Sequence, residues 1–141
     1  MKKSASTLLA LCLTAICLQP ARAADYIVAP TTASICNEHR VLSRIVSRFD
    51  YADDNLLHTG LAIADFSAIQ QTRYEPRTEK NLVERHYCRA YANMTDNRSR
   101  PIWFLIEGDM GYAGIIGDNV EFCVAGLDPL RVYGADCKSL Q

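Results

Sequence analysis

The chain has 141 residues, of which 15 are basic and 16 acidic, so its net charge at pH 7 is −1. Residues 1–23 read as a removable leader, and the 118 residues after it hold 12 basic and 16 acidic side chains, a net charge of −4. That length is enough for one domain and too short for two. The acidic balance does not favour nucleic acid, so we expect no nucleic-acid partner.

The first 23 residues have the three parts of a secretory signal peptide. Lys2 and Lys3 supply the positive start, residues 8–18 form an apolar run, and residues 21–23, Ala-Arg-Ala, form a small-x-small cleavage site. The apolar run is too short to span a bilayer, and no later stretch is long enough. The sequence therefore predicts a signal peptide at 1–23, a single domain at 24–141 and no membrane span. A short Lys-Lys start is typical of bacterial export, so the expected location is periplasmic or secreted.

One amphipathic helix is predicted over residues 34–50. Apolar side chains recur on one side at about 100° per residue, while Arg40, Arg44 and Arg48 fall on the opposite side. We therefore expect the helix to lie on an apolar surface. Its apolar side is formed by Ile35, Leu42, Ile45, Val46 and Phe49.

The rest of the chain reads as strands and turns. Residues 70–81 are polar and predict a long hairpin loop, and the glycine-spaced residues 108–119 predict a bulged hairpin. One helix followed by a meander of antiparallel strands is an α+β fold in which the helix covers one face of a curved sheet. Cystatin-like proteins share this architecture, an analogy that implies no function. Strands are predicted at 60–69, 83–94, 102–107 and 120–126.

Four cysteines follow the predicted signal peptide: Cys36, Cys88, Cys123 and Cys137. An even number in a small exported domain indicates two disulfides, for which three pairings exist. In a consecutive meander Cys88 and Cys123 lie two strands apart, about 9.6 Å, whereas a disulfide tolerates roughly 7 Å between Cα atoms. Cys123 and Cys137 can close a short loop that contains a turn, which leaves Cys36 to join Cys88, so we predict the pairs Cys36–Cys88 and Cys123–Cys137. Cys36 fits awkwardly, because it lies off the apolar side of its predicted helix.

A metal site and a redox site are the alternatives to this disulfide framework. The cysteines lack the C-x2-C spacing of zinc sites, and the histidines His39, His58 and His86 have no i, i+4 partner, so we predict no metal and no other cofactor. A free Cys36 at a helix N-terminus would have a lowered thiol pKa and nucleophilic character, which keeps a redox protein as an alternative.

A candidate binding face lies on the outward side of strand 83–94. Guanidinium groups alternate there with phenol rings, which together offer forked donors for anionic oxygens and flat surfaces for sugar rings or peptide side chains. We expect the partner to be a protein or an anionic glycan. The alternative is a solvated strand face whose side chains pack on cross-strand neighbours. The candidate residues are Arg85, Tyr87, Arg89, Tyr91 and Trp103.

An enzymatic alternative rests on His86. Asp65 or Glu84 could supply the carboxylate that orients it as a general base. Strand alternation, however, places His86 toward the core, which favours a structural histidine whose nitrogens are hydrogen-bonded within the fold. The acidic residues within 50–55 lack the spacing of a calcium-binding loop, so we interpret them as the solvated end of the helix. No catalytic residue is therefore predicted.

Residues 85–114, RHYCRAYANMTDNRSRPIWFLIEGDMGYAG, and 120–137, VEFCVAGLDPLRVYGADC, carry a family resemblance. The chain resembles small exported proteins of alphaproteobacteria that show an aromatic-Cys strand, a Y/W-x-LIE strand and a VEFCV-x-G-x-D…RVY…C ending. The resemblance implies an exported domain with paired cysteines and supplies no catalytic residue. Some such proteins are delivered to host cells, which makes a secreted effector another alternative.

Taken together, these features predict an exported, disulfide-stapled, non-enzymatic binding module of the bacterial periplasm or exterior. A small pocket enzyme using His86, a secreted effector and a redox protein are the alternatives.

Overall fold

The computed structural model of the protein describes residues 34–109 and 117–141. The predicted signal peptide at 1–23 lies outside the described residues, as does the middle of the glycine-spaced segment predicted as a bulged hairpin. Within the described ranges, no helix is long and apolar enough to cross a membrane.

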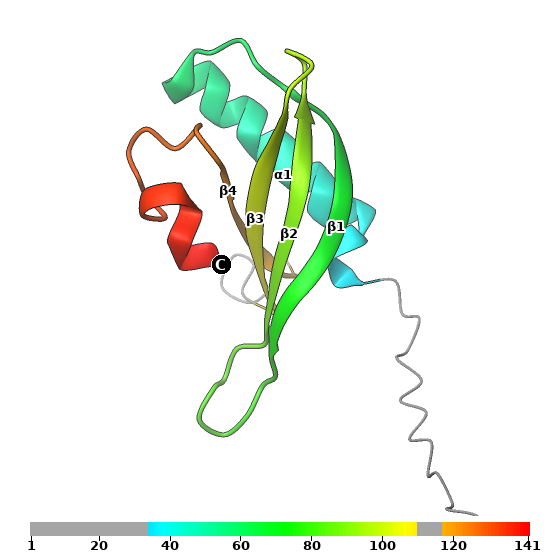
Figure 1. Ribbon diagram of the computed structural model, residues 1–141. Helices are drawn as coiled ribbons and strands as arrows, with labels where there is room; N and C mark the ends of the chain where they lie inside the picture. The colour runs from blue at the N-terminus through cyan, green and yellow to red at the C-terminus, as the bar shows by residue number, and fades with distance from the viewer. Residues whose placement is uncertain (1–33, 110–116) are drawn as a thin grey trace, which may run out of the picture.

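The described chain has the predicted α+β fold (Figure 1). One α-helix, α1, lies across the back of a four-stranded antiparallel sheet whose order, β1-β2-β3-β4, is a simple meander. A π-helical turn, η2, continues the helix, and short 3-10 segments, η1 and η4, begin and end the described chain. The bounds are η1 Ile35–Asn37, α1 His39–Ala52, η2 Asp53–Leu57, β1 Ile63–Glu75, β2 Arg85–Met94, β3 Ser99–Glu107, β4 Asn119–Val124 and η4 Ala135–Leu140.

Helix α1 packs on one face of the sheet and forms the main core. Val41, Ile45 and Phe49 recur every four residues, so they fall on one side of the helix, and all three are buried. Burying each such side chain stabilises the fold by about 1.5 to 3 kcal/mol. Of the predicted apolar side, Ile45 and Phe49 are buried and the other three residues pack partly buried against the core, whereas Val41 is a buried residue that the prediction missed. The facing side chains of β3 are Ile102, Phe104 and Ile106.

The C-terminal segment, residues 125–141 after β4, covers part of the opposite face of the sheet and forms a second, smaller core. Cys137 and Leu140 of η4 pack with Tyr87 of β2 and Leu105 of β3. Tyr87 is consequently only 8% exposed. Its expected outward exposure is wrong, because strand alternation predicts the face on which a residue lies but not which segment returns to cover that face.

The start of the helix differs from the prediction in a way that explains Cys36. Residues 35–37 form a separate 3-10 turn, capped by the Ser34 hydroxyl, which accepts a hydrogen bond from the Cys36 N–H. Glu38 is extended, with ψ of 130°, and interrupts the helical rotation before α1 begins. Cys36 therefore does not follow the rotation of α1, and its side chain is fully buried against the sheet.

The arginine side of α1 lies against the outer edge of β4. Arg44 donates to the carbonyl oxygen of Asp118, and Arg48 donates to the carbonyl oxygen of Val120. Arg40 forms an ion pair with the Asp118 carboxylate at 2.7 Å. Because an open strand edge invites pairing with another chain, these arginines limit such pairing at the start of β4, around Asp118 and Val120.

Strand β1 is longer than predicted. It continues to Glu75, so Gln70 to Glu75 belong to the sheet and the predicted 70–81 hairpin loop is shorter than expected. Its pairing with β2 shifts register at three places, between Ile63 and Asp65, between Ser67 and Gln70, and between Gln71 and Arg73. Residues 70–75 were predicted as loop because they are polar, and the register shift between Gln71 and Arg73 interrupts the two-residue alternation there.

Candidate functional site

The five candidate binding residues share the face of the sheet that points away from α1. Arg85, Tyr87, Arg89 and Tyr91 alternate with core residues along β2, and pairing with β3 sets Trp103 opposite Arg89. Their surroundings differ along the strand, so the structure divides them into two groups.

Arg85 and Tyr87 are engaged within the protein. The Arg85 Nε donates to Glu107 Oε1 at 3.0 Å, and its Nη1 donates to Asn81 Oδ1 at 3.0 Å. Tyr87 lies under the C-terminal segment, and the guanidinium of Arg73 stacks on its ring at 3.6 Å from the centroid. These contacts stabilise the strand pairing; they leave Tyr87 covered and engage the guanidinium of Arg85, whose side chain is 31% exposed.

Arg89, Tyr91 and Trp103 line one concavity, which we call the Arg89 hollow. Its volume is about 190 Å³, and its walls are completed by Ala68, Gln70, Ala90 and Pro101. Tyr91 is 48% exposed, and Arg89 is exposed as well. Arg89 donates from Nε and Nη2 to the Gln70 side-chain oxygen at 3.3 and 3.0 Å, and it forms no salt bridge within the described ranges. A positive group thus stands beside aromatic rings in an open hollow.

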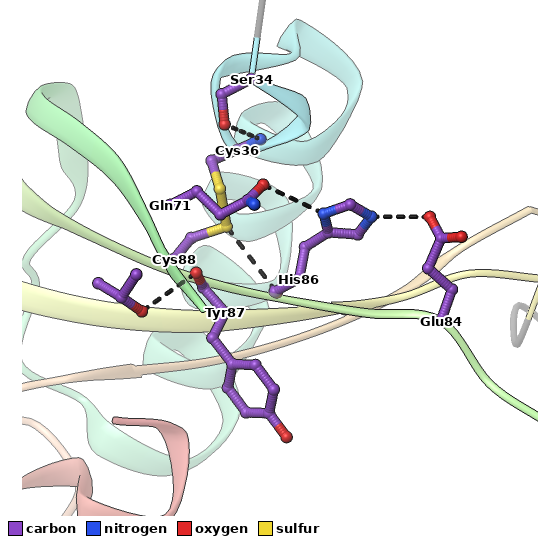
Figure 2. Close-up of a disulfide and its surroundings, with 8 residues drawn as sticks. Ser34, Cys36, Gln71, Glu84, His86, Tyr87 and Cys88 are labelled. Carbon is purple, nitrogen blue, oxygen red and sulfur yellow. Dashed lines mark hydrogen bonds and ion pairs between the residues drawn. A yellow bond between two sulfur atoms is a disulfide. The ribbon is translucent and has the colours of Figure 1, made fainter. Parts of the chain in front are cut away.

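His86 lies at the start of β2, in a small polar cluster shown in Figure 2. One ring nitrogen, Nε2, is 2.8 Å from Glu84 Oε1, and the other, Nδ1, is 3.1 Å from Gln71 Oε1. The Tyr74 ring lies 4.6 Å from the His86 ring, centroid to centroid. Burial and the neighbouring Glu84 carboxylate raise the pKa of Tyr74. The His86 side chain is 14% exposed and sits at the margin of the core rather than within it.

This cluster is poorly arranged for general-base catalysis. A general base needs one nitrogen free to take a proton from the substrate, whereas both nitrogens of His86 have partners in the fold. Glu84 is indeed its carboxylate neighbour, but Asp65 pairs with Asn93, far along β2 from His86. The contacts therefore describe a structural histidine that ties β2 to β1 and to the connection before it.

Both predicted disulfides are present. Cys36–Cys88 has a Cα–Cα distance of 5.9 Å and joins the start of the helical layer to β2, while Cys123–Cys137 spans 5.7 Å and joins β4 to η4. Each bridge thus fixes one of the two layers to the sheet. Cys36 is bonded and buried, so it is not the free helix-terminal thiol of the redox alternative. In the part of the chain that the structure describes, no cluster of three or more His, Cys, Asp or Glu residues is placed to hold a metal ion.

Asp53 is a buried polar residue whose role the sequence did not indicate. Its carboxylate accepts hydrogen bonds from the backbone N–H groups of Thr59 at 3.0 Å and Gly60 at 2.8 Å, and from the Thr59 hydroxyl. The Thr59 hydroxyl bond, followed by the two backbone bonds, lowers the pKa of Asp53. Reading the whole 50–55 group as a solvated helix exit is therefore wrong for Asp53, which fixes the connection from η2 to β1.

Comparison of the chain with protein-family models, curated proteins and solved structures found no match. The functional conclusions below therefore rest on the residues and geometry of this chain.

Proposed function

We propose that the protein is an exported, non-enzymatic binding module that works in the bacterial periplasm or outside the cell, and that the Arg89 hollow is its contact site. Two disulfides in a domain of this size suit an oxidising compartment, which supports export. The observation that carries the binding proposal is the grouping of Arg89, Tyr91 and Trp103 around one open hollow.

The chemistry of the hollow favours an anionic glycan over a protein partner. A guanidinium binds carboxylate or sulfate oxygens with two parallel hydrogen bonds, and aromatic rings offer flat apolar surfaces to sugar rings. The Gln70 amide adds a hydrogen-bonding group beside Arg89. The C-terminal segment covers the neighbouring part of this sheet face, so the open area suits a narrow chain better than the broad patch of a typical protein interface, roughly 800 Å² on each side.

Titration calorimetry with an oligomer of galacturonic acid tests this proposal. We expect saturable binding of the acid and much weaker binding of its methyl ester, which keeps the sugar rings but removes the negative charges. Replacing Arg89 by Ala should weaken binding about 10- to 100-fold, because a charge-assisted hydrogen bond is worth about 1.5 to 3 kcal/mol. The melting temperature should change little, since Arg89 is exposed.

Arg77→Ala is the matched control. It removes the same charge from an exposed residue in the β1–β2 connection, where Arg77 pairs with Asp109. An equal loss of affinity in Arg77→Ala and Arg89→Ala would indicate non-specific charge attraction and would contradict the proposed site. Absence of binding to the acidic oligomer together with capture of a protein through Arg89 would assign the hollow to a protein partner instead.

A further inference from the structure

A second, apolar hollow lies away from the Arg89 hollow, at the outer edge of β4. Its volume is about 150 Å³, and it is lined by Phe49 of α1, Leu57 of η2, Phe122 and Val124 of β4, and Leu130 and Tyr133 of the C-terminal segment. We call it the β4-edge hollow. One wall belongs to the helices α1 and η2 and another to the C-terminal segment, and these two parts of the chain cover opposite faces of the sheet.

The lining residues show that the hollow crosses the strand edge. Phe122 pairs with Phe104 and therefore faces α1, whereas Cys123 faces the C-terminal segment, to which it is bonded. A concavity lined by both faces of a strand at the end of a sheet must lie over its free edge.

The backbone of β4 presents hydrogen-bonding groups toward this side. The Ala125 N–H donates to the Pro101 carbonyl oxygen at 2.8 Å. Because backbone direction alternates along an antiparallel strand, the N–H and C=O of Cys123 also point toward β3, whereas those of Phe122 and Val124 point outward. Arg48 occupies the outward carbonyl of Val120, and Leu127 donates to that of Val124. Among the described residues, no hydrogen bond is found for the outward N–H groups of Val120, Phe122 and Val124 or for the C=O of Phe122, so they form a short open stretch of edge.

The rim of the hollow carries exposed apolar side chains. Leu56 is 57% exposed, Leu130 66% and Val132 68%. Asp128 also lines the hollow, and its two carboxylate oxygens accept hydrogen bonds from the backbone N–H groups of Val132 and Tyr133, so both oxygens are engaged within the C-terminal segment. The site therefore combines an apolar hollow with a row of backbone donors and acceptors.

We propose that the β4 edge binds a short extended peptide segment, which adds to the sheet as a further strand and places one large apolar side chain in the hollow. Strand addition of this kind takes affinity from main-chain hydrogen bonds and specificity from pockets for alternate side chains. Phe122 and Val124 supply the main-chain bonds, and Phe49, Leu57 and Leu130 enclose the side chain. The site is separate from the Arg89 hollow and does not depend on glycan binding there.

A peptide fits this edge better than a second copy of the chain or a simple lipid. Arg44 and Arg48 occupy the carbonyls of Asp118 and Val120, so any added strand can pair only around Phe122 and Val124. A short peptide needs no more than this stretch, whereas two whole copies pairing β4 against β4 would share too few hydrogen bonds. A hydrocarbon chain would fill the hollow but leave the outward N–H groups of Phe122 and Val124 without partners, at a cost that a peptide strand avoids.

Fluorescence anisotropy with labelled, end-capped hexapeptides tests the proposal on the disulfide-intact protein. Two probes alternate Thr and Lys around a central Phe or Ala, and a third carries the central Phe with its amide nitrogen and that of the next residue methylated. We expect saturable binding of the Phe peptide and at least tenfold weaker binding of both others. In amide NMR spectra, the Phe peptide should shift the Phe122 and Val124 resonances and slow their hydrogen exchange.

Leu130→Asp should abolish this binding without unfolding the protein, because Leu130 is largely exposed. Leu82→Asp is the matched control, since Leu82 is 72% exposed in the β1–β2 connection, away from β4. Equal binding of the methylated peptide would show a merely apolar site and overturn the proposal, as would absence of binding by the Phe peptide at millimolar concentration. Concentration-dependent dimerisation that Leu130→Asp abolishes, with no peptide binding, would assign the edge to a second copy and would also overturn it.

Discussion

Asp53 shows how a single carboxylate fixes a connection in this protein. It accepts bonds from Thr59 and Gly60, so the ionised side chain stabilises the turn that leads from η2 into β1. His58 lies inside this turn in the left-handed backbone region, with φ of 52°, a conformation that the Asp53 bonds support. Charge and local backbone geometry are therefore coupled at this residue.

The stability of the protein should fall in acid because of this coupling. The pKa of Asp53 is lowered by its hydrogen bonds, and hydrogen bonding to Arg100 lowers the pKa of Asp96 to about 2. A carboxylate with a lowered folded-state pKa stabilises fully above its unfolded value, near 3.9, and loses that effect as pH falls through the folded value. We expect the free energy of unfolding to decrease between about pH 4 and pH 2.

Urea unfolding of Asp53→Asn at pH 6 and pH 2.5 measures the contribution of Asp53. The variant should be less stable than the wild type at pH 6, and the difference should narrow at pH 2.5, because protonation of the wild-type carboxylate removes the charge that the Thr59 and Gly60 hydrogen bonds favour. Asp54→Asn, which changes an exposed neighbour in the same turn, is the control. A difference that stays constant with pH would show that the charge of Asp53 does not stabilise the turn.

The sequence predicted the face of single residues better than their environment. Alternation along β2 correctly separated Cys88, Ala90 and Ala92, which are buried beneath α1, from Arg89 and Tyr91. It did not predict that Tyr87 is covered, because the covering residues come from the end of the chain. The bonds of Asp53 were missed for a related reason, since its partners lie six and seven residues away with no helical or strand period.

At the scale of elements, α1 serves the sheet in two ways. Its apolar side packs on the sheet, and its arginine side lies along the edge of β4, where Arg44 and Arg48 donate to backbone carbonyls. The sequence predicted two sides of the helix, but it placed the arginines opposite the core without indicating that they reach a strand edge.

Replacing Arg48 by Met tests this second role while keeping much of the apolar stem. The Val120 carbonyl would lose its charged donor, so we expect a loss of about 1 to 2 kcal/mol in the free energy of unfolding. Hydrogen exchange of β4 amides should also become faster. Arg77→Met serves as the control, and equal stability of both variants would mean that the Arg48 contact does not contribute.

Element boundaries show where sequence patterns stop being informative. The helix, all four strands and their order were predicted, since apolar periodicity marks each of them. The break at Glu38 and the three register shifts of β1 were not, because single extended or bulged residues leave no periodic signal. These irregularities have structural consequences: the first turns Cys36 toward the sheet, and the others lengthen β1.

At the scale of the whole molecule, two disulfides hold a three-layer arrangement together. Cys36–Cys88 closes a loop with a sequence separation of 52 residues, and Cys123–Cys137 closes one of 14. On the chain-entropy model their removal costs about 4 and about 3 kcal/mol, respectively. The first bridge fixes the helical layer, and the second fixes the segment that covers Tyr87 and forms one wall of the β4-edge hollow.

The fluorescence of Trp103 can show whether the C-terminal segment has detached from the sheet, because Trp103 is the one tryptophan of the sequence and packs against the second core. Replacing Cys123 and Cys137 by Ala should shift its fluorescence emission to longer wavelength while the far-ultraviolet circular dichroism of the sheet and α1 persists. Replacing Cys36 and Cys88 by Ala should leave the emission of the folded fraction unchanged. Equal shifts in both variants would contradict the independence of the two layers.

The proposed exported, disulfide-stapled module is tested most directly by one mass-spectrometric measurement. The protein is alkylated as it leaves the cells, digested without reductant, and its terminal and crosslinked peptides are identified. We predict a mature chain that begins at Ala24, no alkylated cysteine, and two linked peptides that join Cys36 to Cys88 and Cys123 to Cys137. A retained residue 1–23 segment with alkylated cysteines at these four positions would contradict export and the disulfide framework together.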